Sequence, residues 1–198
     1  MEPIYHWDII QGTQEWDEIR LGKLTGSDFH TFLTCKTETR EIALAEKAAE
    51  RVLADTDTEK TTTWAMERGH TLEPEARRLY QAINDVTVDE VGFVSLGDYV
   101  GCSPDGLVGN DGIIEIKCPI AKNFLLWRKK NYIKPEYKTQ IQFNLFVTGR
   151  KWCDFFVYHP RLGYYCIRVE QNQETQDAIR LAIDACVQSI KEYEEQCN

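Results

Sequence analysis

Residues 101–119, GCSPDGLVGNDGIIEIKCP, decide the fold. The Asn-Asp-Gly sequence at residues 110–112, flanked by aliphatic residues, is typical of a β-hairpin turn. Alternate residues of a strand share one face, so Glu115 and Lys117 are expected to point to the same side of the second strand. Asp105 lies in a turn before the first strand of the hairpin. The hairpin is therefore expected to gather two carboxylates and one ammonium group in a small volume.

This grouping suits phosphodiester cleavage assisted by hard metal ions. Mg²⁺ prefers oxygen ligands in an octahedral shell and keeps several waters, so two or three carboxylates are sufficient protein ligands. A bound ion lowers the pKa of its water and offsets the charge that builds on the phosphorus. A neighbouring lysine can orient or deprotonate that water, and the ion is expected to lower the lysine pKa. A Glu-x-Lys pair alone is more typical of a salt-bridged surface hairpin than of a catalytic site. With Asp105 placed across the hairpin, the catalytic interpretation becomes the favoured one.

The same residues resemble a known nuclease signature. The pattern Pro104-Asp105 … Glu115-Ile116-Lys117 resembles that of the PD-(D/E)XK nuclease superfamily. The strings CSPDGL and EIKCP resemble its lambda-exonuclease/YqaJ branch, the viral alkaline exonucleases of phage recombination. Three further stretches are similar to motifs of that branch and follow in matching order: WDEIRLGKLTGS at residues 16–27, RGHTLEPEAR at residues 68–77 and YKTQIQ at residues 137–142.

The resemblance implies a metal-dependent catalytic site. Glu73, Asp105 and Glu115 would be metal ligands, with the backbone carbonyl of Ile116 as a further ligand. Lys117 would act on the nucleophilic water. The expected cofactor is Mg²⁺, with Mn²⁺ as a substitute and two ions in each active site.

Further roles follow from the other motifs of the resemblance. Gln140 would help to hold the site from the helix after the hairpin. Arg20 and Ser27 would bind the terminal 5′-phosphate of DNA, and Ser27 is also expected to cap a helix N-terminus, where phosphate binding is favoured. Pro74 departs from the family's helix motif because it directly follows the helical carboxylate, so Glu75 is kept as the alternative ligand.

Charge is distributed unevenly along the chain. The net charge is −9, from 23 Lys and Arg against 32 Asp and Glu, and taken globally this argues against nucleic acid binding. Residues 117–138, however, contain seven basic residues and one acid, whereas residues 170–198 contain seven acids and two bases. A basic band on one surface can still hold an anionic polymer. The candidate DNA contacts in this band are Lys122, Trp127, Arg128, Lys129 and Lys130.

Length and composition exclude several protein classes. The chain has 198 residues, 42% of them hydrophobic and 28% charged, which predicts one globular domain over residues 1–198. No apolar run approaches the roughly 18–20 residues of a membrane helix, and residues 1–12 do not resemble a secretory signal. Seven scattered cysteines without a CxxC pair argue against a disulfide framework and against zinc or iron–sulfur sites. We therefore expect a reduced, cytoplasmic protein, and the resemblance to phage enzymes implies that the cytoplasm is that of a bacterial host.

Hydrophobic periodicity predicts a mixed α/β (α+β) fold. The resemblance implies a central mixed sheet flanked by helices, the restriction-endonuclease-like core of the PD-(D/E)XK enzymes. Helices are expected at residues 14–33 (two helices joined by a turn at 24–27), 40–53, 66–83, 122–131, 136–148 and 174–195. Strands are expected at residues 86–88, 91–96, 99–103, 107–108, 113–114, 152–158 and 164–169, and a loop at residues 55–63. Tryptophans outside the basic band, Trp7 among them, are expected to be core or interface anchors.

The sequence thus predicts an Mg²⁺-dependent exonuclease that acts on the ends of duplex DNA, and the resemblance implies that it degrades linear double-stranded DNA in the 5′→3′ direction. The resemblance implies a homotrimeric ring and a 3′ single strand left for a phage annealing protein. One alternative is another PD-(D/E)XK nuclease, either an endonuclease or a Cas4-like repair enzyme. The C-terminal cysteine spacing does not resemble the iron–sulfur cluster of Cas4-like proteins. The other alternative is an inactive DNA-binding relative, against which the intact Asp105, Glu115 and Lys117 argue.

Overall fold

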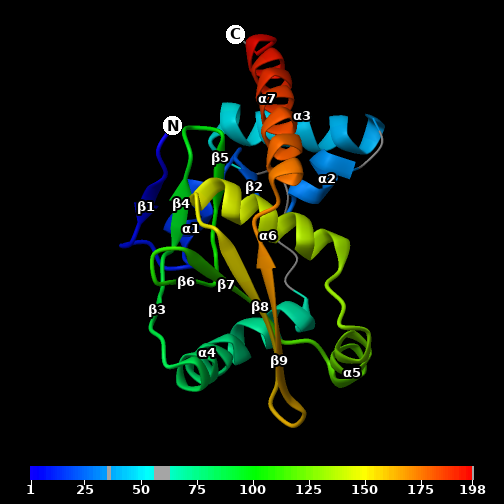
Figure 1. The fold of residues 1–198 in the computed structure, drawn as a ribbon. Coiled ribbons are helices and arrows are strands. Elements are labelled where there is room, and N and C mark those ends of the chain that lie inside the picture. The colour runs from blue at the N-terminus through cyan, green and yellow to red at the C-terminus, as the bar shows by residue number, and fades with distance from the viewer. Residues whose placement is uncertain (35–36, 56–62, 198) are drawn as a thin grey trace.

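The computed structural model describes residues 1–34, 37–55 and 63–197, which form two β-sheets packed among helices (Figure 1). The loop expected at residues 55–63 falls mostly outside the described residues. The strands divide into two sheets, whereas the sequence predicted one central sheet. The mixed α/β class with flanking helices is confirmed.

The first sheet has the order β1-β4-β5-β2. Its strands are β1 (Ile4–His6), β4 (Phe93–Ser95), β5 (Val100–Cys102) and β2 (Leu24–Thr25). Strand β4 pairs antiparallel with β1 and β5, whereas β2 pairs parallel with β5. The sequence predicted a turn where β2 lies and did not predict β1. Both strands are too short to show a hydrophobic period, and pairing with distant strands defines them.

The second sheet has the order β3-β6-β7-β8-β9. Its strands are β3 (Val88–Asp89), β6 (Gly106–Val108), β7 (Gly112–Lys117), β8 (Trp152–His159) and β9 (Gly163–Glu170). Strand β7 pairs antiparallel with β6 and parallel with β8, so the sheet is mixed. The hairpin predicted by the Asn-Asp-Gly turn is the β6–β7 pair.

The expected helices are present, with ends shifted by a few residues. They are α1 (Gln14–Arg20), α2 (Phe29–Thr34), α3 (Thr37–Leu53), α4 (Trp64–Asn84), α5 (Ala121–Lys130), α6 (Pro135–Thr148) and α7 (Gln173–Glu195). Helix α4 continues through Pro74. Ser27 is not the residue that caps α2, because that helix begins two residues later at Phe29. Within the described residues, no helix combines the length and apolar character needed to cross a membrane.

Strand β7 separates two apolar clusters. Ile113 belongs to the larger cluster with Phe155 of β8 and the buried face of α6. Ile114 belongs to the smaller cluster with Phe156 of β8 and the buried face of α4. This alternation is the period of two expected for a strand with both faces buried. Glu115 takes the next position on the α6 side and is 0% exposed, so the fold places a carboxylate inside the protein.

Candidate active site

Strand β7 carries the two residues whose shared face the sequence predicts. The Nζ atom of Lys117 lies 2.5 Å from Oε1 of Glu115. Asp105 approaches from the turn before β6, and its Oδ2 accepts a hydrogen bond from the backbone N–H of Ile116 at 2.6 Å. The hairpin therefore brings Asp105, Glu115 and Lys117 together.

Helix α4 supplies a third carboxylate. Glu73 lines a cavity together with Asp105, and Nη2 of Arg77, one helical turn later, lies 2.5 Å from its Oε1. Glu75 turns away and accepts a hydrogen bond from the hydroxyl of Tyr158 at 2.6 Å. Because α4 is continuous here, Glu73 and Glu75 occupy different sides of the helix. The structure thus places Glu73 beside the hairpin residues.

Helix α6 adds two amides around Glu115. The side chain of Gln140 hydrogen-bonds Glu115, and Nδ2 of Asn144 donates to its Oε2 at 3.5 Å. Gly26 permits this packing, since a Cβ atom at that position would collide with the Asn144 side chain. The sequence motif identified Gln140 but missed Asn144. The spacing of four residues, which places both amides on one helix face, was the available signal.

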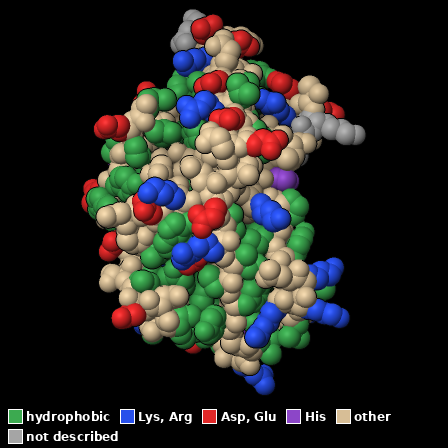
Figure 2. Space-filling model, viewed as in Figure 1, with side chains coloured by type: hydrophobic (Ala, Val, Ile, Leu, Met, Phe, Trp, Pro, Cys, Tyr) green, Lys and Arg blue, Asp and Glu red, His purple; other side chains and the backbone are tan. Residues whose placement is uncertain are grey.

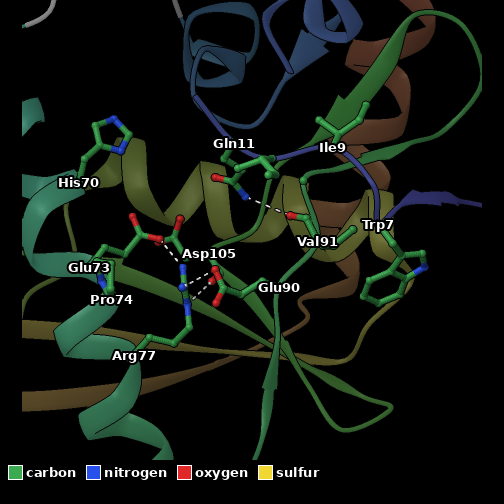
Figure 3. Close-up of a pocket in the computed structure, with 12 residues that line it drawn as sticks. Trp7, Ile9, Gln11, His70, Glu73, Pro74, Arg77, Glu90, Val91 and Asp105 are labelled. Carbon is green, nitrogen blue, oxygen red and sulfur yellow. Dashed lines mark hydrogen bonds and ion pairs between the residues drawn. The ribbon is translucent and has the colours of Figure 1, made fainter. Parts of the chain in front are cut away.

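The site opens into two adjoining cavities. The larger has a volume of about 560 Å³ and is lined by Glu73, Asp105 and Lys117 and by aromatic side chains of α5 and α6. The smaller, about 270 Å³, extends from Glu73 and Asp105 toward the segment after β1 (Figure 3). Glu73 and Asp105 therefore lie where the two cavities meet.

Arg20 and Ser27 lie together next to the hairpin. Nη2 of Arg20 donates to Oγ of Ser27 at 3.3 Å, and Nη1 donates to Oγ of Ser103 at 3.5 Å. The guanidinium stacks on the ring of Trp16, 4.1 Å from its centroid. Ser103 precedes Asp105 by two residues, so this cationic group adjoins the carboxylates. The sequence analysis did not single out Ser103.

A family model for the YqaJ-like viral recombinase domain matches residues 15–151, which include all these groups. The chain belongs to the YqaJ-like viral recombinase family. The crystal structure of an alkaline exonuclease (LHK-Exo) from Laribacter hongkongensis superposes with a TM-score of 0.84 at 35% identity, covering 93% of this chain and 96% of that chain. A structure of LHK-Exo in complex with dAMP matches with the same values.

A more distant structure shares the fold of this YqaJ-like domain. It is a phage related exonuclease from Haemophilus somnus 129PT, with a TM-score of 0.68 at 13% identity, covering 89% of this chain and 96% of that chain. The comparison with curated proteins gives no match. The predicted family and the PD-(D/E)XK-like fold are thereby confirmed, and homology to alkaline exonucleases supports a nuclease.

Basic residues of α5 form an exposed strip beside the larger cavity of the YqaJ-like domain. The exposed members are Lys122, Arg128, Lys129 and Lys130. Lys and Arg side chains gather over this part of the molecule in Figure 2. Trp127 is only 6% exposed and packs edge-on against Tyr137, so any contact with DNA is limited to the edge of the ring that borders the cavity.

Burial raises the pKa of all three carboxylates of the site. Burial and the charge of Asp105 raise the pKa of Glu73 to about 7, against the opposing effect of Arg77. Burial also raises the pKa of Glu115 to about 7, with Lys117 opposing and Asp105 adding to the shift. The pKa of Asp105 is raised by burial as well. The site therefore disfavours the ionised form of these carboxylates, mainly because they are buried.

The pKa of Lys117 is raised above its ordinary value. Burial lowers it, but the charges of Glu115 and Asp105 outweigh burial. The sequence analysis expected a lowered pKa on the assumption of an adjacent metal cation. Without such a cation Lys117 is an ammonium group that donates to Glu115. A role as a base would require added positive charge at these carboxylates.

The donor groups of the site fit a hard divalent cation, and nucleases of this kind generally use divalent metals. The carboxylates offer oxygen ligands, and a divalent cation would favour the ionised form that burial and the charge of Asp105 disfavour at Glu73 and Glu115. Over the described ranges of the chain, no three His, Cys, Asp or Glu side chains already form an ion-binding group. Lys117 holds Glu115 and Arg77 holds Glu73, so an ion would compete with both ion pairs.

The raised pKa values predict that the metal-free protein loses stability as pH rises. A carboxylate with a folded pKa near 7 and an unfolded pKa of about 4.3 favours folding while it is protonated, so its contribution is lost between about pH 4.5 and 7. We expect Tm in EDTA to fall by several degrees across this window. Glu115→Gln, which cannot ionise at residue 115, should show a smaller fall. A Tm that is flat or rises in the native protein would contradict the prediction.

Arg77 is predicted to position two groups of the site. Its guanidinium binds Glu73, donates to the backbone carbonyl of Asp105 at 3.0 Å, and lies 2.5 Å from the exposed carboxylate of Glu90. Hydrogen bonds to charged groups contribute about 1.5–3 kcal/mol, so Arg77→Ala should slow cleavage by about 10- to 100-fold. Glu90→Gln, which removes only the exposed partner, should change the rate by about twofold or less. Wild-type cleavage by Arg77→Ala, with unchanged Mg²⁺ dependence, would contradict this role.

Proposed function

We propose that this protein is a divalent-metal-dependent exonuclease that degrades linear double-stranded DNA in the 5′→3′ direction and leaves a 3′ single strand. The observation that carries the proposal is the meeting of Asp105, Glu115 and Lys117 on one hairpin, beside the separate Arg20–Ser27 group. The first group suits phosphodiester hydrolysis. The second suits recognition of a phosphate at a strand end.

The residues divide the work of hydrolysis. Mg²⁺, or Mn²⁺ in its place, would be held as two ions by Glu73, Asp105, Glu115 and the carbonyl of Ile116. When bound, the metal supplies an activated water and Lewis acidity at the phosphate. Lys117 orients that water from its position on Glu115, while Gln140 fixes the Glu115 carboxylate.

The cations set the path of the DNA. Arg20 and Ser27 bind the terminal 5′-phosphate through a guanidinium that Trp16 holds in place. A planar guanidinium with several donors is well matched to phosphate oxygens. The exposed strip on α5 follows the backbone of the incoming duplex, with Trp127 at the edge of the cavity. Such contacts predict binding that weakens as salt rises.

The proposal includes a ring-shaped homotrimer and a phage-type annealing protein that receives the 3′ strand, in the cytoplasm of a bacterial host. A ring would turn the basic strip toward its channel and leave the acidic surfaces outside, which reconciles a net charge of −9 with DNA binding. Light scattering measures the molar mass directly. A monomer that retains full processivity would contradict the ring.

The function is tested with linear duplex DNA that carries a separate label at each 5′ and 3′ end. With Mg²⁺, wild-type protein should release the 5′ label first, as mononucleotides, and EDTA should stop the release. A closed circular duplex is the matched substrate control and should stay intact. Loss of the 3′ label first would overturn the polarity, and cutting of the circle would favour an endonuclease.

A further inference from the structure

The two cavities that meet at Glu73 and Asp105 differ in charge. Besides these carboxylates, the larger cavity is lined by the cations Arg68, Lys117 and Lys134. The smaller cavity has a third carboxylate, Glu90, and one Arg or Lys side chain, Arg77, which is already paired with Glu73 and Glu90. A phosphate is therefore attracted to the larger cavity and repelled by the smaller one.

The rest of the smaller cavity is lined by apolar residues and by two polar side chains. The apolar residues are Trp7, Ile9, Ile10, Pro74, Val91 and Gly92, and the polar ones are Gln11 and His70. A recess that combines apolar faces with a few polar groups suits the flat ring of a nucleobase with its polar edge. The cavity therefore has the chemistry of a site for a nucleobase.

Trp7 forms one end of this cavity and is 57% exposed. Its ring stacks on Tyr5, with centroids 5.8 Å apart and planes 16° apart. The Tyr5 hydroxyl in turn donates to the carbonyl of Thr148 at 3.1 Å. The sequence analysis expected a core or interface anchor at this position, and the core role is wrong. The structure instead shows a supported aromatic ring that faces solvent near the carboxylates.

The segment that carries Trp7 is fixed to the catalytic hairpin. Nε2 of Gln11 donates to the carbonyl of Val91 at 3.1 Å and to the carbonyl of Pro104, the residue before Asp105, at 3.0 Å. Gly92 lies so close to the Ile9 carbonyl that any Cβ atom there would collide with it. Figure 3 shows Trp7 and the carboxylate pair at opposite ends of the pocket, with the Gln11 side chain between them. The segment that carries the Trp7 ring is therefore held at a set position relative to Asp105.

We propose that the smaller cavity is a nucleobase subsite, in which the Trp7 ring stacks on the base of the nucleotide that cleavage releases. The proposal rests on the proposed function and deepens it. The phosphate stays on the cationic side of the carboxylates while the base enters the side that Trp7 lines. Every base has a π-face, so the subsite accepts all four bases, and loss of one base–aromatic stack should reduce the rate about 5- to 100-fold.

The test combines a change in the protein with a change in the DNA. Single-turnover cleavage is measured on duplexes whose terminal nucleotide is either normal or abasic. We expect wild type to cleave the normal end about 5- to 100-fold faster than the abasic end, and Trp7→Ala to lose most of this ratio. Trp7→Phe should retain much of it. Ile4→Ala is the matched control, because Ile4 lies on β1, three residues before Trp7, is 60% exposed and does not line the cavity.

A second readout needs no cleavage. 2-Aminopurine placed at the terminal nucleotide should lose fluorescence on binding to Lys117→Ala protein, and keep it on binding to the Trp7→Ala, Lys117→Ala double variant. Equal base-to-abasic ratios in wild type and Trp7→Ala, with equal quenching, would overturn the subsite. A lower molar mass of Trp7→Ala with an unchanged ratio would also overturn it and make Trp7 a subunit contact. Quenching by Trp7 without any cleavage by wild type would retain the subsite and refute the exonuclease.

Discussion

Lys117→Ala is expected to lower the rate of duplex cleavage by about 10²- to 10⁴-fold while DNA is still bound. Lys117 Nζ pairs with Glu115 in the cavity that Asp105 also lines, so its removal takes away the cation that we propose orients the attacking water. Single-turnover cleavage of end-labelled duplex measures the rate, and fluorescence anisotropy measures binding. Little change in affinity is expected, because the exposed cations of α5 remain.

One further variant and a stability measurement separate an effect on chemistry from effects on charge and folding. Lys134→Ala removes another lysine that lines the same cavity and pairs with Glu136 on the surface, so its effect should be about tenfold or less. Lys117→Ala also leaves the buried Glu115 without its cation, which destabilises the fold, so Tm is measured for each variant. A Lys117→Ala protein that is less stable but cleaves at the wild-type rate would make Lys117 a structural residue.

The hairpin of the site could be predicted because its signals are local. A turn of Asn, Asp and Gly and the alternation around Glu115 each depend on a few neighbouring residues, and the structure contains the strands they predict. The division into two sheets could not be predicted in this way. Strands β1 and β2 have two or three residues each and exist through pairing with β4 and β5, which are distant in sequence.

The choice between Glu73 and Glu75 needed the structure because of Pro74. A proline can end a helix, kink it or begin its ordered part, and each outcome turns a different carboxylate toward the hairpin. Helix α4 runs through Pro74, with Glu73 beside Asp105 and Glu75 on Tyr158. The local sequence around Pro74 therefore does not decide between the two carboxylates.

Support for the site comes from residues to which the sequence analysis assigned no role. Asn144 and Arg77 act on Glu115 and Glu73, yet each is an ordinary polar residue on its helix. Trp7 could not be assigned from composition, since a tryptophan is more often buried than left as an exposed platform. Only the packing of the segment after β1 against Val91 and Pro104 places Trp7 near the carboxylates.

Arg20→Ala is expected to erase the preference of the enzyme for a 5′-phosphate. The Arg20 guanidinium stacks on Trp16 and donates hydrogen bonds to the hydroxyls of Ser27 and Ser103. When DNA binds, the guanidinium can donate to phosphate oxygens in place of these hydroxyls. Hydrogen bonds to a charged group contribute about 1.5–3 kcal/mol, so wild type should cleave a 5′-phosphorylated end about 10- to 100-fold faster than a 5′-hydroxyl end. Arg20→Ala should bring this ratio close to one.

The ratio distinguishes a specific pocket from general attraction to DNA. Lys23→Ala is the matched control, because Lys23 is a nearby cation that donates to the carbonyl of Asp98 and should leave the ratio unchanged. Arg20→Lys keeps the charge but loses the planar set of donors, so it should restore binding more than it restores the ratio. If Arg20→Ala slows both ends equally, Arg20 contributes only to backbone binding. The catalytic cleft itself would then have to select the 5′ end, because Arg20 would not distinguish a 5′-phosphate from a 5′-hydroxyl.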